Sequence, residues 1–229
     1  MLHDHRRALW YAFALLGSLG FVLFAVGRHP ASAAPLTTIP FVGRFDQQMY
    51  DAVDHIRVTP LTWLFRFLNV VGGGIVTIPL RAIASLYLLA RRWWRRAAGF
   101  ILTWAASELI LTFLKSWFHR GRPPEGIVTV IGYSFPSGHA TAAAATAVAL
   151  VLAFLPAGAS RRKWEWLAAV FSFAMAFSRV YLHAHWFSDV VAGVLLGSGI
   201  AIGAFALINE VATMALGRPV DQPDTAAEA

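Results

Sequence analysis

The chain has 229 residues, of which 58% are hydrophobic and 14% are charged. A soluble domain has roughly 45–50% apolar and about 25% charged residues, so this composition argues against a soluble protein. The chain has no cysteine, which excludes disulfides and thiolate metal sites. Its net charge of +7 fits the excess of Lys and Arg in cytoplasmic loops of membrane proteins better than binding to nucleic acid.

Long apolar blocks predict an all-α protein, a bundle of six transmembrane helices. A span needs about 20 apolar residues to cross a hydrocarbon layer of about 30 Å. The predicted spans cover residues 8–27, 70–90, 97–114, 140–156, 166–181 and 190–209, and the fourth and fifth are short. We expect one domain over residues 1–216 and a polar, disordered tail over residues 217–229.

The first predicted span has a second interpretation. Arg6 and Arg7, an apolar run and then Ala31-Ser32-Ala33 resemble a cleavable signal peptide. The apolar core of a signal peptide has about 7–15 residues, and this run is longer, so an uncleaved membrane anchor is preferred.

An amphipathic segment follows over residues 40–60. Apolar residues recur there at helical spacing, and polar residues fill the positions between them. The pattern predicts an amphipathic helix lying in the outer membrane interface. A short helix packed over the bundle explains it equally well.

Basic residues indicate the orientation of the spans. They cluster in the short loops on one side of the predicted bundle, at Arg6-Arg7, residues 91–96, residues 161–163 and Arg218. The positive-inside rule therefore places this side and the N-terminus in the cytoplasm. A second set of cationic or imidazole side chains ends up at the outer ends of the spans: Lys115, Arg122, His139, Arg179 and His185. Because this set opposes the inside bias, it predicts an anion site on the outer face.

Three blocks of residues hold these side chains at fixed spacing. The first is Lys115 with Arg122-Pro123 seven residues later, and the second is Pro136-Ser137-Gly138-His139. The third is Ser178-Arg179, five residues, His185, three residues and Asp189. Each block is weak alone, but together and in this order they resemble the type 2 phosphatidic acid phosphatase family, which also includes vanadium haloperoxidases.

The resemblance implies roles for these residues. His185 would attack phosphorus to form a phosphohistidine, and His139 would be the general acid that protonates the leaving oxygen. Asp189, four residues after His185, would orient its ring and stabilise its charged form, although it could also cap a helix. The phosphate-binding residues implied are Lys115, Arg122, Ser137, Gly138 and Arg179.

Some residues near the motifs stay open. Ser137 could simply be an N-cap. His119, Arg120 and His183 lie outside the motif and are secondary candidates, and Arg120 could widen the anion site toward a second phosphate. The outer loops lack a cluster of carboxylates, so we expect phosphate to be held by fixed cations, with no metal ion or other cofactor.

One further pair is expected within the bundle. Arg81 and Glu108 lie at similar depth in the second and third predicted spans, which are neighbours joined by a short turn. Because lone charges at mid-bilayer are costly, we expect an ion pair between them.

The expected function is that of an integral membrane hydrolase that acts on a lipid phosphomonoester or diphosphate in the lipid bilayer. Undecaprenyl diphosphate is the favoured substrate, because the site would face the periplasmic side of a bacterial inner membrane. Phosphatidylglycerophosphate and phosphatidic acid are alternatives. A non-enzymatic lipid-binding or transport protein is disfavoured because both His139 and His185 are present, and a vanadate-dependent oxidoreductase because those relatives are soluble. The sequence indicates no particular oligomeric state.

Overall fold

The computed structural model describes residues 5–28 and 37–216, and these residues form helices and loops without any strand. The helices are α1 (His5–Val26), α2 (Pro40–His55), α3 (Thr59–Val71), α4 (Gly74–Ala90), α5 (Trp94–Phe118), α6 (Gly138–Phe154), α7 (Ala159–Tyr181) and α8 (Phe187–Leu216). The all-α prediction is thus confirmed for this part of the chain. The alternative of a cleavage site at residues 31–33 and the predicted tail at residues 217–229 concern residues outside it.

The helices differ in whether their length and apolar composition allow them to cross a membrane. Among the described residues, α1, α5 and α8 are each long and apolar enough to do so. The pair α3 and α4 makes a fourth span if it is counted as one helix bent by 46°. Of the other two, α6 has only 17 residues and α7 carries several charges in its first turns. The number of six spans therefore stays a prediction.

The second predicted span is broken, which the apolar pattern did not indicate. It was expected to start at residue 70, but α3 ends at Val71 and α4 begins at Gly74. Glycine disfavours helix, and a side chain at Gly72 would be 2.6 Å from Sδ of Met175 and 3.1 Å from the ring of His139. Helix α3 thus reaches the site of His139 because three glycines interrupt the span.

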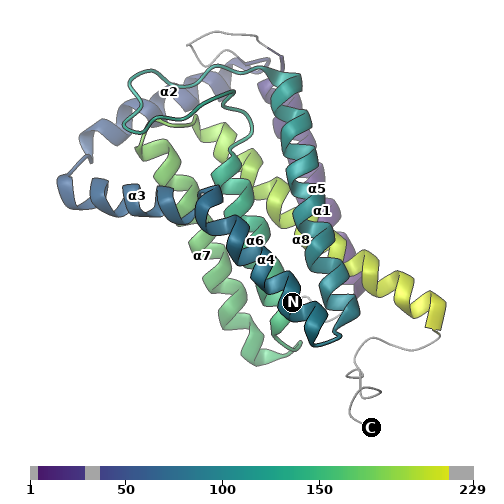
Figure 1. The fold of residues 1–229 in the computed structure, drawn as a ribbon. Coiled ribbons are helices and arrows are strands. Elements are labelled where there is room, and N and C mark those ends of the chain that lie inside the picture. The colour runs from purple at the N-terminus through teal and green to yellow at the C-terminus, as the bar shows by residue number, and fades with distance from the viewer. Residues whose placement is uncertain (1–4, 29–36, 217–229) are drawn as a thin grey trace.

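Helix α2 lies across one end of the bundle (Figure 1). Val53 is buried against Ala140, Val180 and Val190, and the ring of Phe45 packs edge-on against Phe187 at 5.2 Å. The amphipathic segment is therefore a helix packed over the bundle, and its position in the membrane interface stays a prediction.

Close packing of α6 against α8 sets the geometry of that end. Added side chains at Gly193 and Gly197 would stand 2.7 Å and 2.4 Å from backbone oxygens of Ser137 and Thr141. Small residues let the two backbones approach this closely, as at many helix contacts in membranes. The approach brings the start of α6 beside the start of α8, where Ser137 N donates to the Asp189 carbonyl at 3.0 Å.

The predicted ion pair between Arg81 and Glu108 is confirmed. Arg81 Nη1 lies 2.6 Å from Glu108 Oε1, and Arg81 also donates to Thr146 Oγ1 at 2.7 Å and to the Ala142 carbonyl at 3.1 Å. Arg81 is buried, whereas half of the Glu108 side chain is exposed. The pair therefore lies at the edge of the bundle, not in its centre as expected.

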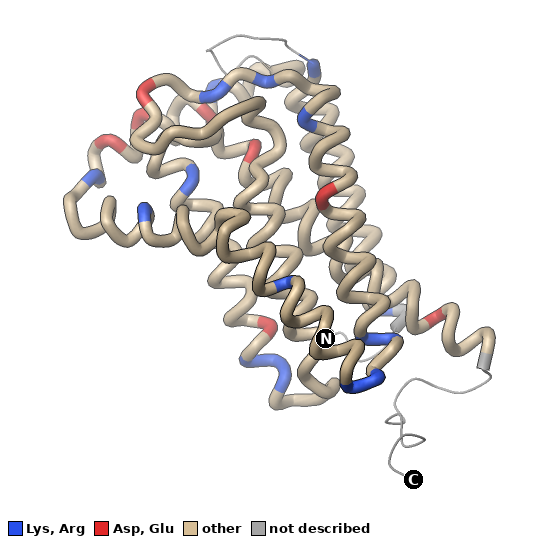
Figure 2. Tube along the Cα trace, viewed as in Figure 1, with Lys and Arg blue, Asp and Glu red and all other residues tan. Residues whose placement is uncertain are grey.

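Figure 2 shows the Lys and Arg residues of the α4–α5 turn and of the start of α7 at the same end of the bundle, opposite α2. This separation agrees with the topology inferred from the sequence. Which end faces the cytoplasm stays a prediction.

Candidate active site

All the residues of the three motif blocks meet at the end of the bundle covered by α2. Lys115 comes from the last turn of α5, and Arg122 from the loop that joins α5 to α6. Ser137, Gly138 and His139 open α6, and Arg179 lies in the last turn of α7. His185 precedes α8, and Asp189 lies in its first turn.

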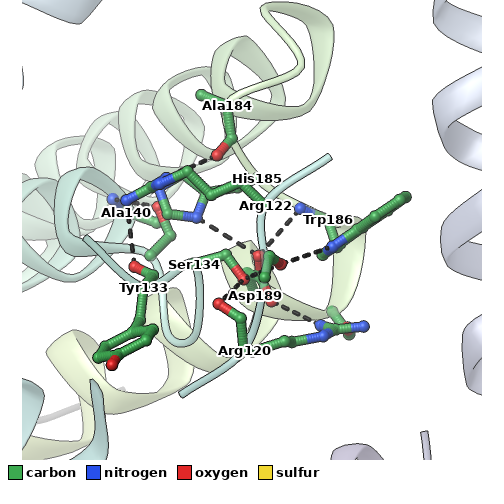
Figure 3. A network of polar contacts seen from close by, with 12 residues as sticks. Arg120, Arg122, Tyr133, Ser134, Ala140, Ala184, His185, Trp186 and Asp189 are labelled. Atoms are coloured by element: carbon green, nitrogen blue, oxygen red, sulfur yellow. Dashed lines mark hydrogen bonds and ion pairs between the residues drawn. The ribbon is translucent and has the colours of Figure 1, made fainter. Parts of the chain in front are cut away.

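His185 and Asp189 form a buried pair at the centre of the site (Figure 3). His185 Nδ1 lies 3.4 Å from Asp189 Oδ2, and the same oxygen accepts from Trp186 N at 2.9 Å. Asp189 therefore caps the start of α8 and also faces His185, so both of its expected roles have a structural counterpart. The separation of 3.4 Å is long for a hydrogen bond.

The hydrogen bonds of His185 define its tautomer. Nε2 lies 3.1 Å from Arg122 Nη1, and because an arginine can only donate, Nε2 must present its lone pair. The proton of the neutral ring then lies on Nδ1, toward Asp189. Burial, followed by the charges of Arg122, Lys115 and Arg179, lowers the pKa of His185 well below its usual value. The ring is therefore neutral at pH 7, with its lone pair directed among cations.

Lys115 and Arg122 are held by backbone carbonyl oxygens of the α5–α6 and α7–α8 loops. The Tyr133 carbonyl accepts from Lys115 Nζ at 2.6 Å and from Arg122 Nη2 at 3.1 Å. Arg122 also donates to the carbonyls of Gly132 at 2.8 Å and Ala184 at 2.7 Å. These oxygens offset the repulsion between the two cations and fix them beside His185.

Asn69 of α3, which the sequence analysis missed, connects His139 with Arg179. Its carbonyl oxygen lies 3.0 Å from His139 Nε2, and its side-chain oxygen accepts from Arg179 Nη1. Arg179 is fully buried, yet its Nε and Nη2 have no hydrogen-bond partner. Buried donors rarely stay unpaired, so these two groups are suited to bind an anion. The signal for Asn69 was a lone amide before three glycines in an apolar stretch.

Ser137 serves α6 more than it serves an anion. It is the N-cap of α6, and its Oγ accepts from Ala140 N at 3.5 Å. Its own N–H donates to the Asp189 carbonyl, so the expected contact of Ser137 with phosphate would have to come from its hydroxyl and stays a prediction. Gly138 and His139 are the first two residues of α6, so their N–H groups have no acceptor within the helix. Such groups are suited to bind an anion.

The secondary candidates lie outside the anion site. His119 ends α5 in the left-handed conformation, with its ring edge-on to Tyr133. His183 stacks on Tyr50 at 3.9 Å. Arg120 contacts Asp46 and Asp189 through Nη2 and Nη1, and among the described residues its Nε has no partner, so these contacts do not support a role toward a second phosphate, which stays a prediction.

Residues 5–28 and 37–216 contain no group of three or more His, Asp or Glu side chains that could hold a metal ion. Independence from metal nevertheless stays a prediction that requires an assay.

Comparison with known proteins gives three related findings. The model of the PAP2 superfamily matches residues 96–212. An undecaprenyl-diphosphatase of Sulfolobus acidocaldarius is 27% identical over 165 residues, which are 69% of this chain and 75% of that protein. Phosphatidylglycerophosphatase B of Bacillus subtilis is 29% identical over 161 residues, 66% of this chain and 77% of that protein.

A solved structure has the same fold. It is the crystal structure of a transmembrane PAP2-type phosphatidylglycerolphosphate phosphatase from Bacillus subtilis, with a TM-score of 0.72 and 23% sequence identity. The match covers 90% of this chain and 97% of that one, so the resemblance extends to the helices outside residues 96–212.

Proposed function

Because the chain belongs to the PAP2 superfamily of phosphatases, we propose that it is an integral membrane lipid phosphatase that works through a phosphohistidine on His185. One observation carries this proposal: the neutral, buried ring of His185 presents its Nε2 lone pair among the cations Arg122, Lys115 and Arg179. A nucleophile in a ring of cations suits an electrophile that carries several negative oxygens, which describes a phosphoryl group.

In the first step, His185 Nε2 forms a bond to phosphorus while the bond from phosphorus to the leaving oxygen breaks. The unpaired Nε and Nη2 of Arg179, together with Lys115 and Arg122, offset the charge on the phosphoryl oxygens. His139, in its protonated form, donates a proton to the leaving oxygen and becomes neutral. Asp189 stabilises the positive charge that His185 gains.

In the second step, water attacks the phosphohistidine. His139, now neutral, accepts a proton from that water, and the bond between Nε2 and phosphorus breaks to release inorganic phosphate. His185 returns to its neutral form with its Nδ1 proton toward Asp189. The cycle is complete without a metal ion.

The substrate we propose is a lipid phosphate, with undecaprenyl diphosphate favoured and phosphatidylglycerophosphate or phosphatidic acid as alternatives. The relatives support the class: one is named an undecaprenyl-diphosphatase and another a phosphatidylglycerophosphatase. Arg120 no longer supports a diphosphate, because it is occupied by carboxylates. The preference therefore rests on the expected outward direction of the site.

We also propose that α1, the bent pair α3–α4, α5, α6, α7 and α8 make six spans, with the site on the periplasmic face of a bacterial inner membrane. At 1.5 Å per residue, a helix the length of α6 covers most of the hydrocarbon layer. The basic clusters at the end opposite the site support this orientation.

The test is phosphate release from a panel of lipid phosphates by the purified chain in mixed micelles containing EDTA. The panel includes undecaprenyl diphosphate, phosphatidylglycerophosphate and phosphatidic acid, and His185→Ala is the control variant. We expect release by the wild type, none by the variant, and the highest kcat/KM for the diphosphate. No release from any lipid refutes the phosphatase proposal, and a requirement for added magnesium refutes the metal-free mechanism.

A further inference from the structure

Helix α2 places a carboxylate beneath the surface of the site. Asp46 has only 1% of its side chain exposed, although most polar residues of α2 face outward. Arg120, with 4% exposed, lies between Asp46 and the fully buried Asp189. Three charged side chains from α2, the α5–α6 loop and α8 thus share one buried cluster.

The hydrogen bonds within this cluster are short and specific. Arg120 donates through Nη2 to Asp46 Oδ2 at 2.7 Å and through Nη1 to Asp189 Oδ1 at 2.6 Å. Asp46 also accepts from the backbone N and the Oγ of Ser188, at 2.8 Å and 2.6 Å. One arginine therefore connects two carboxylates. Ser188, the residue before Asp189, also binds Asp46 directly.

The pattern of donors suits an ionised Asp46. All its partners donate to it, including Ser188 Oγ, which itself accepts from Arg120 Nη1 at 2.8 Å. An ionised Asp46 accepts all of these contacts, whereas a protonated one would have to reverse its bond with Ser188 Oγ. Burial raises the pKa of Asp46 above its usual value, although the charge of Arg120 and the hydrogen bonds from Ser188 and Arg120 oppose this effect. Burial also acts to lower the pKa of Arg120, but Asp189 and Asp46 raise it above its usual value, so the arginine stays charged.

The cluster acts on the face of Asp189 that is turned away from His185. Arg120 binds Oδ1, while Oδ2 faces His185 Nδ1 and Trp186 N. A carboxylate held at both oxygens cannot turn away from the imidazole. Burying ions is costly and apolar packing is often as stable, so stability alone does not account for this arrangement.

We propose that Asp46 and Arg120 are positioning residues for the pair His185–Asp189, which makes α2 part of the catalytic apparatus. Arg120 fixes the Asp189 carboxylate, and Asp46 fixes Arg120 and balances its charge. This inference rests on the proposed function of His185.

The cluster has an electrostatic signature that a merely structural role lacks. Removing the negative charge of Asp46 leaves more positive charge near His185 and lowers its pKa, whereas removing the positive charge of Arg120 raises it. The other charged or titratable groups facing His185 are unchanged in both variants: Asp189 from α8, Arg122 from the loop, Lys115 from α5, Arg179 from α7 and His139 from α6.

The experiment compares Asp46→Asn, Arg120→Gln and the double variant with Asp51→Asn, an equal charge change at an exposed position of α2. Purified full-length proteins are assayed for kcat and KM across pH on the lipid of the panel that the wild type hydrolyses with the highest kcat/KM. We expect kcat to fall on the order of 100-fold in the single variants, with little change in KM, because the phosphate-binding cations are intact. The acid limb of kcat/KM should move to lower pH in Asp46→Asn, to higher pH in Arg120→Gln, and back in the double variant. Asp51→Asn should match the wild type.

Several outcomes overturn the proposal. One is a wild-type kcat in Asp46→Asn, and another is movement of the acid limb in the same direction in both single variants. If neutral variants fail to fold, Arg120→Lys provides the test, because it keeps the charge but loses the planar fork. Its kcat should fall with no shift of the acid limb, and a wild-type kcat would overturn the proposal. If the wild type itself releases no phosphate, the proposed function fails and takes this inference with it. An active wild type with variants that match Asp51→Asn refutes the inference alone.

Discussion

Replacing Asn69 with alanine should impair catalysis although Asn69 belongs to none of the motif blocks. Its side-chain oxygen accepts from Arg179 Nη1, and its backbone carbonyl accepts from His139 Nε2. Asn69→Ala removes the first contact and leaves the second, so the variant isolates the orientation of Arg179.

The size of the effect follows from the environment of Arg179. The side chain is fully buried, and Asn69 is the acceptor of Nη1, while Nε and Nη2 have no partner. A hydrogen bond to a charged group contributes about 1.5–3 kcal/mol. Because about 1.4 kcal/mol corresponds to a factor of ten in rate, kcat/KM should fall roughly 10- to 150-fold. KM should rise because Arg179 would bind the phosphoryl oxygens in the ground state, and kcat should fall because that contact would strengthen in the transition state.

The assay is steady-state phosphate release from a lipid phosphate in mixed micelles, with thermal denaturation to confirm folding. Asn209→Ala is the matched control, because Asn209 is a half-buried asparagine near the far end of α8. It should behave as the wild type. A folded Asn69→Ala protein whose kcat/KM stays within about twofold of wild type would refute the role of Asn69.

Three more results are expected. First, kcat/KM should stay constant as the pH falls to 6.5 and should decline only below that pH. The reason is that burial and nearby cations lower the pKa of His185 and keep its ring neutral. An acid limb at or above pH 6.5, after correction for titration of the substrate, would contradict this prediction. Second, Glu108→Gln should cost about 2 kcal/mol of stability in lipid nanodiscs, since Arg81 keeps its other acceptors but loses its counter-charge; unchanged thermal denaturation would exclude a stabilising pair. Third, Gly197→Ala should cost about 1–3 kcal/mol because its Cβ would lie 2.4 Å from a carbonyl oxygen of α6, whereas Gly203→Ala, at 3.6 Å from its neighbour, should cost nothing; equal denaturation temperatures would argue against close packing of α6 on α8.

The sequence was informative where the spacing of residues carries the structure. Arg81 and Glu108 could be paired because two apolar helices joined by a short turn place residues at calculable depth, and the ion pair is present. The meeting of the motif residues followed from the ends of the predicted spans in the same way. Two details were not predicted. Three glycines interrupt the second predicted span near its start, and Glu108 is half exposed because of how its helix is rotated in the bundle.

The sequence was uninformative where a contact depends on tertiary structure. Asp46 stands among other polar residues of an amphipathic helix, and nothing in the local pattern distinguishes it from those that face outward. Its contact with Arg120 joins residues 74 positions apart and forms only because α2 folds back over the bundle. The carboxylate partners of Arg120 were not predicted for the same reason, because an unpaired arginine beside an anion site and one that connects two carboxylates look identical in sequence.

The site contains two kinds of residue, the groups that would react with or bind the phosphate and the residues that hold those groups in position. His185, His139, Lys115, Arg122 and Arg179 all belong to the motif blocks. Outside those blocks, α3 holds Arg179 and His139 through Asn69, and the carbonyls of Gly132 and Tyr133 hold Lys115 and Arg122. Arg120 lies within the first block but is not one of the residues that define it, and it joins Asp46 of α2 to Asp189. An imidazole or guanidinium placed about 1 Å away from its productive position can lose on the order of 100-fold in rate, so these supports matter as much as the groups they hold. Transplanting the three motif blocks into another helical bundle should therefore transfer the groups but not the activity, unless equivalents of Asn69, Asp46 and the loop carbonyls accompany them.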